Sequence, residues 1–413
     1  MGSAVGAALP FVVTAVILSA ARTDVFFLVA GAGQLAAYLL ATVVEGAALP
    51  SALRVAQRDV AGLRRATRRL AVDALILALP VTLGLLLVGL LLLSIADLDP
   101  GQLHDGRRLL LAFLPLPALV AVSSTCSAAH YAQDHFAFTA ASQGLRASGG
   151  LAGALLAASG HGGTIGVALG LCIGEACRAL LLSSTLPRSP PGPPPLDDDP
   201  GQRGIFLRSA TPLLLATIIV AVNPLVDKAV ASQLDVGSVT LLELAEKLFY
   251  IPMVLLFTAV TVVSGVVWAR LGEGELAAVS KDFWRVQRLA GAVSLSITAV
   301  AAIVVLSLDD VVVDVLGLEP GAPFGSVFGL YILGLPFALA QSLAGRLLVV
   351  LGKTRQLPAI AVALVLLNLV ADIVGAATLG VRGIALASSL VRIVNAAVFL
   401  LLARRLFQAA RST

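Results

Sequence analysis

Long uninterrupted apolar runs are the feature that most limits how this chain can fold. Runs of helical length, bounded by charges or by Gly and Pro clusters, recur along the whole sequence. They fall at residues 4–21, 24–45, 71–96, 109–129, 138–159, 164–186, 209–232, 239–267, 289–308, 325–350, 358–379 and 382–403. About twenty apolar residues cross a bilayer as a helix, and only helices or closed barrels satisfy the backbone there. The sequence therefore predicts an all-α polytopic membrane protein with about 12 transmembrane helices.

Composition excludes several classes of function. Hydrophobic residues make up 58% of the 413 residues and charged residues only 13%, about half the charge of a soluble domain, which excludes a large soluble catalytic domain. The three Cys and four His residues fit no disulfide framework, metal site or catalytic triad, and no phosphate-binding GxxxxGK[ST] loop occurs. We therefore expect neither an enzyme nor a nucleic-acid-binding protein, with no cofactor and no metal site.

A proline-rich segment divides the chain almost in the middle. Residues 187–208 include a run of prolines and then three aspartates, so they can neither continue a helix nor bury themselves. We expect an N-terminal six-helix lobe over 1–186, a cytoplasmic linker over 187–208 and a C-terminal six-helix lobe over 209–413. Gly166-Val167-Ala168-Leu169 and Gly383-Ile384-Ala385-Leu386 occupy matching places in the two halves, which indicates an internal repeat.

Basic residues between the spans predict the orientation. Of the 28 Lys and Arg residues, 18 follow even-numbered spans or lie near the C-terminus, and four lie on the opposite side. The four are Arg22, Arg107, Arg108 and Arg382. Since cytoplasmic loops retain basic residues, we expect a multi-pass protein with both termini in the cytoplasm.

Charges inside the spans are the candidate functional groups. The basic ones are Arg146, Arg178, Lys228, Lys247, Arg346 and Arg392. At roughly 2.5 to 3.5 kcal/mol for each charge at the bilayer centre, six exposed to lipid would cost on the order of 15 to 20 kcal/mol. Most must face a partner, a helix end or a water-filled cavity. Glu243 and Lys247 are four residues apart, so they can also simply neutralise each other on one helix face.

Several motifs resemble one transporter family in order and spacing. The segments Asn223-Pro224-Leu225-Val226-Asp227-Lys228 and Leu244-Ala245-Glu246-Lys247-Leu248-Phe249-Tyr250-Ile251-Pro252 are similar to spans seven and eight of the MurJ/MviN lipid II flippases. Thr23-Asp24-Val25-Phe26-Phe27 resembles the opening of family span two, and the stretch from Arg346 to Pro358 resembles the loop between spans ten and eleven. That family belongs to the multidrug/oligosaccharidyl-lipid/polysaccharide exporter superfamily.

The resemblance implies a flippase for a lipid-linked cell-envelope saccharide, the peptidoglycan precursor lipid II, in the bacterial inner membrane. Two lobes would rock around a central cationic cavity by alternating access, and H⁺, Na⁺ or the membrane potential would drive the cycle. Lys247 and Arg346 would contact phosphate, Asp24 and Glu246 would orient the cargo or couple ions, and Arg392 is a further substrate-binding candidate. The partners implied are the lipid-linked oligosaccharide, membrane lipids and cell-wall synthesis proteins.

Two alternatives stay open at this point. One is an ion-coupled exporter of small cationic or drug-like molecules from the same superfamily. The other is a scaffold of the envelope-synthesis machinery without transport, because Met1 to Ala21 and Gly31 to Thr42 lack the arginines that the family carries on its first two spans.

Overall fold

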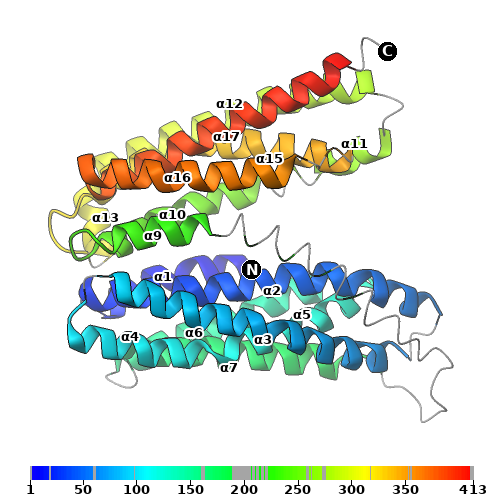
Figure 1. The fold of residues 1–413 in the computed structure, drawn as a ribbon, viewed down its shortest axis with the longest axis horizontal. Helices are drawn as coiled ribbons and strands as arrows, with labels where there is room; N and C mark the ends of the chain where they lie inside the picture. The colour runs from blue at the N-terminus through cyan, green and yellow to red at the C-terminus, as the bar shows by residue number, and fades with distance from the viewer. Residues whose placement is uncertain are drawn as a thin grey trace. The chain divides into compact units, whose positions relative to one another are not determined.

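The computed structural model describes residues 2–17, 20–58, 62–96, 98–159, 163–187, 206, 210, 214, 218, 222–256, 260–261, 263–271, 276–316, 318–351, 353 and 356–409. Within these ranges the regular secondary structure is helical and contains no strand. The chain forms two compact units, 1–225 and 226–413 (Figure 1). The linker predicted over 187–208 lies outside the described residues except at Pro187 and Phe206.

The first unit is a bundle of seven helices among its described residues. They are α1 Gly2–Ile17, α2 Ala20–Arg58, α3 Leu63–Ile95, α4 Pro100–Phe113, α5 Pro115–Tyr131, α6 Phe136–Ala158 and α7 Gly163–Ser184. α5 packs against α2, α3 and α7, and it buries Val120 and Ala121. α5 is therefore the central helix of this unit.

Glycines set the contact between α6 and α7. A Cβ atom at Gly149 or Gly153 of α6 would collide with the backbone of α7 at Gly170 or Gly166. The two helices therefore touch through their main chains, with no side chain between them. Figure 1 shows them as a close pair at the edge of the unit.

The second unit begins within α9 and continues to the C-terminal helix. Its helices are α9 Asn223–Ala231, α10 Ser238–Leu256, α11 Val263–Leu271, α12 Leu276–Ser307, α13 Asp309–Val315, α14 Phe324–Ile332, α15 Leu335–Val350, α16 Leu357–Leu379 and α17 Val381–Ala409. A core of large side chains joins α11, α12, α15 and α17. Its fully buried members include Trp268, Phe283, Leu343 and Leu347.

A single residue turns α16 into α17. Gly380 has φ +59° and ψ −140°, a backbone conformation that favours glycine, and its N–H donates to the carbonyl of Ala376. Beyond this turn a Cβ atom at Gly383 would collide with the backbone of Gly375. The spans predicted at 358–379 and 382–403 lie on either side of this turn.

Eight helical stretches of the described chain are long and apolar enough to cross a membrane. They are Arg22–Leu53, Leu63–Ile95, Pro100–Tyr131, Gly163–Ser184, Leu276–Ser307, Phe324–Leu348, Leu357–Leu379 and Val381–Gln408. On α3, Leu79, Leu83 and Leu87 repeat every fourth residue and are all more than half exposed, which suits a lipid-facing stripe. Each predicted span overlaps one or more of the helices, and the all-α polytopic fold is confirmed.

Candidate functional site

A buried carboxylate binds two lysines in the second unit. Both Glu243 and Lys247 lie on α10, and Lys228 lies on α9. Lys247 Nζ lies 3.1 Å from one carboxylate oxygen of Glu243, and Lys228 Nζ pairs with the other. The side chains of Glu243 and Lys228 are 1% and 7% exposed, whereas that of Lys247 is 22% exposed. The predicted i,i+4 pair is therefore formed, and Lys247 is its accessible member.

Glu246 adds a second carboxylate to this group. It is buried on α10, with Lys228 and Lys247 as its favourable electrostatic neighbours. The cluster of Lys228, Glu243, Glu246 and Lys247 thus contains two cations and two anions within a short stretch of two helices. Such a group is compatible with burial because each charge has an opposite neighbour.

Oxygen-bearing side chains from three helices meet beside this cluster. The amide nitrogen of Asn368 donates to Asp227 at 2.7 Å and to Asp372 at 2.8 Å, and the Ser388 hydroxyl donates to the other Asp227 oxygen at 3.0 Å. Asp372 is fully buried, and its Oδ1 has no hydrogen-bond partner among the described residues.

Two carboxyl groups around one amide are suited to a single positive charge. No group of three or more His, Cys, Asp or Glu side chains in the described ranges can hold a metal ion. Asp227, Asp372 and Ser388 nevertheless offer the oxygen donors that hard cations prefer, and the free Asp372 oxygen needs a proton or a cation. The arrangement therefore fits one proton or one monovalent cation.

Arg392 lies between two aromatic rings. Its guanidinium carbon is 4.2 Å from the ring centroids of both Phe249 and Tyr331, and its Nη1 donates to the Tyr331 carbonyl at 3.4 Å. Ser389 also donates to that carbonyl, at 3.1 Å. The Tyr331 carbonyl is in the last turn of α14 and also accepts from the Gly334 N–H at 3.2 Å. The Arg392 and Ser389 side chains therefore add two donors to this helix end. Gly334 makes room, since a Cβ atom there would lie 2.7 Å from Arg392 Cδ.

Two more residues were predicted for the site, Arg346 and Asp24. Arg346 is exposed on α15 and packs against Gly265 of α11, where a Cβ atom would lie 2.9 Å from Arg346 Cγ. It has no ion pair with any residue that the structure describes. Asp24 is half-buried on α2 of the first unit. The structure thus brings together Lys247 and Glu246 on α10, adjoined by Arg392 through Phe249, but not Arg346.

The first unit holds a separate buried ionic cluster. Arg178 on α7 contacts Glu175 at 3.1 Å and donates to Ser127 on α5 at 2.9 Å and to Ser142 on α6 at 3.3 Å. Ser123 also donates to Glu175. The flanking charges, Arg146 and Glu45, lie 3.7 Å from Glu175 and 4.0 Å from Arg178 and are partly exposed. The cluster is neutral and ties four helices together.

Neither Asn368 nor Ser388 was given a role from the sequence. The available signal was the i,i+4 spacing of Asn368 and Asp372 in an otherwise apolar span, which places both polar groups on one helix face. The pairing of Lys228 with Glu243 was also not predicted, because that contact joins two helices.

Comparison with known proteins identifies the family. The model of the family described as lipid II flippase MurJ matches residues 63–412. No curated protein matches the chain. A solved structure of the lipid II flippase MurJ in an inward closed conformation has a TM-score of 0.74 at 17% identity, covering 98% of this chain and 86% of that one.

Transporters of the wider superfamily share the fold as well. An inward-facing multidrug resistance MATE family transporter has a TM-score of 0.78 at 13% identity, covering 99% of this chain and 95% of that one. A superfamily transporter from Pyrococcus furiosus, described as having a binding pocket of reverse polarity, has a TM-score of 0.63 at 13% identity, with coverage of 100% and 96%. These likenesses show the fold, whereas the family model covers most of the sequence. The chain is a multi-pass helical membrane protein that belongs to the MurJ lipid II flippase family.

Proposed function

We propose that this protein is a flippase that moves a lipid-linked cell-envelope saccharide, the peptidoglycan precursor lipid II, across the bacterial inner membrane. Transport would proceed by alternating access with both termini in the cytoplasm. The observation that carries the proposal is the Lys228–Glu243–Lys247 group, in which one ammonium is accessible inside a membrane-spanning bundle. A cation in that position suits the diphosphate of a lipid-linked sugar.

The difference in exposure between the two lysines supports separate roles for them. Lys228 is buried and compensates Glu243, so Glu243 stays paired when Lys247 turns away. Lys247 can therefore exchange its carboxylate partner for a phosphate without leaving a buried charge unpaired. In this mechanism the Glu246 carboxylate attracts the Lys247 ammonium back toward the buried cluster when the cargo leaves.

The oxygen-rich group beside this cluster would couple transport to an ion. Asp227, Asn368, Asp372 and Ser388 would hold one Na⁺ or one proton, which supplies the charge that the orphaned Asp372 oxygen lacks. Binding there would hold α9, α16 and α17 together. Release would let α9, and with it Lys228, move away from α16.

Substitution of Lys247 tests the proposed function. In cells depleted of their own flippase, labelled lipid II at the outer surface is measured for the native chain, Lys247→Ala, Lys247→Arg and Lys281→Ala. Lys281 is an exposed lysine on α12 and serves as the matched control. We expect flipping by the native chain, Lys247→Arg and Lys281→Ala, and its loss in Lys247→Ala. Undiminished flipping by Lys247→Ala would reject the phosphate role, and no flipping by the native chain would reject the cargo.

One observation favours the ion-coupled exporter as a second candidate. The charges around the second-unit site comprise four acids and three bases. They are Asp227, Glu243, Glu246, Asp372, Lys228, Lys247 and Arg392. An excess of acid suits a cationic substrate. Increased tolerance of an overexpressing strain to cationic drugs, lost in Glu246→Gln, would support this alternative over lipid II transport.

A further inference from the structure

Two glycines fix the register of the hairpin formed by α3 and α4. A Cβ atom at Gly89 of α3 would lie 2.5 Å from Leu110 Cδ1 of α4, and one at Gly106 of α4 would lie 2.6 Å from Leu93 Cδ2 of α3. The helices run in opposite directions and approach closely at these two points. α3 ends two residues beyond Leu93, at Ile95, and α4 begins at Pro100.

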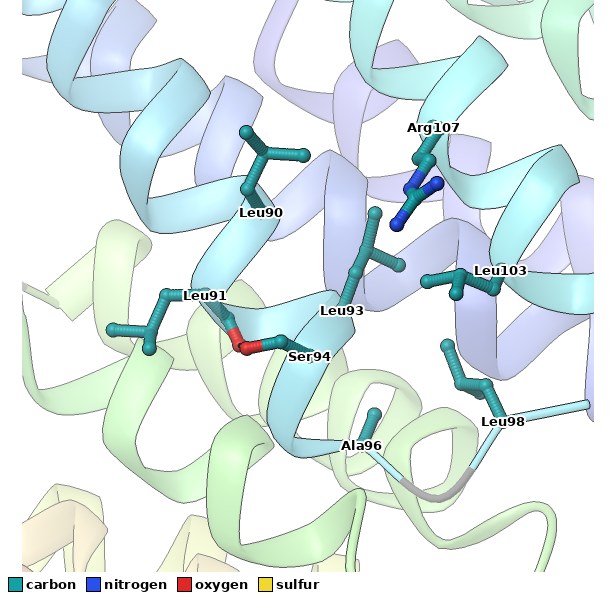
Figure 2. A pocket seen from close by; sticks show the side chains of 8 residues that line it. All are labelled: Leu90, Leu91, Leu93, Ser94, Ala96, Leu98, Leu103 and Arg107. Atoms are coloured by element: carbon teal, nitrogen blue, oxygen red, sulfur yellow. Dashed lines mark hydrogen bonds between the residues drawn. The ribbon is translucent and has the colours of Figure 1, made fainter. Parts of the chain in front are cut away.

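A cavity of about 660 Å³ lies at this end of the hairpin. Its lining is mostly aliphatic and comes from the end of α3, the connection and the first half of α4. The residues are Leu90, Leu91, Leu93, Ser94, Ala96, Leu98, Leu103 and Arg107. Figure 2 shows Arg107 reaching from α4 toward Leu93 and Leu103, so the cavity has one charged group among its leucines.

Arg107 has no acidic partner among the residues that the structure describes. Its side chain is exposed, and it makes no hydrogen bond or ion pair with any residue within the described ranges. It is also one of only four basic residues on the side of the membrane where the sequence predicts few of them. Leu90 and Leu91 at the same cavity are 40% and 58% exposed. Exposed leucines at the end of a membrane-spanning hairpin face lipid rather than water.

We propose that this cavity is a binding site for an anionic glycerophospholipid, whose phosphate pairs with Arg107 and whose acyl chain lies along the leucines. Guanidinium binds phosphate oxygens with two parallel hydrogen bonds, and the aliphatic surface matches a hydrocarbon chain. One arginine balances one phosphodiester charge. A diphosphate-linked saccharide carries more charge and a bulky polar head, and no second basic residue lines the cavity. This lining therefore does not fit the proposed cargo, and the inference does not depend on the proposed function.

Native mass spectrometry of the full chain in mild detergent tests this site. Phosphatidylglycerol and phosphatidylcholine with identical acyl chains are titrated separately, and bound lipid is counted on the native chain, Arg107→Ala, Arg108→Ala and Leu103→Trp. Arg108 is the matched control, because it is the next exposed arginine on the same helix and does not line the cavity.

We expect the native chain and Arg108→Ala to prefer phosphatidylglycerol. Loss of the charged hydrogen bond in Arg107→Ala should weaken that binding by about tenfold and abolish the preference. Leu103→Trp fills the cavity and should lower the binding of both lipids. Equal binding of the two lipids by the native chain, or unchanged binding by Arg107→Ala, would overturn the proposal. A dimeric native chain that becomes monomeric in Leu103→Trp would also overturn it, because a second copy of the chain would then occupy the cavity. Since Arg107 is exposed, its substitution should leave the fold intact.

Discussion

The two lysines that share Glu243 should differ sharply in their contribution to stability. Lys228 and Glu243 are both almost fully buried, so removal of either leaves a buried charge without its closest partner. Breaking such a pair from one side costs about 3–5 kcal/mol. Removal of Lys247 leaves Glu243 paired with Lys228, and a partly exposed pair contributes less than about 1 kcal/mol. We therefore expect Lys228→Met and Glu243→Gln to be strongly destabilising and Lys247→Met to be nearly neutral.

Thermal unfolding in detergent measures this difference. For a unit of this size, a loss of about 3 kcal/mol lowers Tm by about 6–12 °C. The double variant Lys228→Met/Glu243→Gln removes both buried charges and should recover part of the loss, giving a coupling of about 2 kcal/mol or more in a double-mutant cycle. Equal effects of Lys228→Met and Lys247→Met, or an additive double variant, would refute the assignment of Lys228 as the structural partner.

Four further outcomes follow from the buried charges and the helix contacts. Arg178→Met should lower the stability of the first unit by about 3–5 kcal/mol, because Glu175 loses its closest cation, and the drop in Tm should shrink when Glu175→Gln is added. Gly153→Leu should abolish the monodisperse peak in size-exclusion chromatography, because the new side chain collides with the α7 backbone. Gly291→Ala on α12 should instead raise the free energy of unfolding by about 0.5–1 kcal/mol, because its Cβ atom meets open space. If Na⁺ binds beside Asp372, Tm should be higher in NaCl than in KCl, and Asp372→Asn should remove this difference. An undiminished difference in Asp372→Asn would show that Na⁺ binds at another site.

The spans were predictable because they follow from local rules. A bilayer requires every backbone group to be paired within its own segment, so the length of an apolar run is enough to identify a helix. The pair Glu243–Lys247 was equally local, since its two residues are four positions apart on one helix.

The contacts between helices were not predictable in the same way. Lys228 meets Glu243, and Asp227 meets Asn368, only because α9, α10 and α16 pack at particular angles. Arg392 illustrates the same limit, because the sequence places a charge in a span but does not show that two aromatic rings and the α14 terminus surround it. A lone charge in an apolar run therefore indicates that partners exist without naming them.

The seam between α6 and α7 restricts how the first unit can move. Sliding one helix along the other by a single residue would bring a side chain to the positions where Gly149 and Gly153 now face Gly170 and Gly166. Shear between these two helices is therefore blocked by their own main chains, although packed helices elsewhere often slide. In any conformational change the two helices should therefore move together as one body.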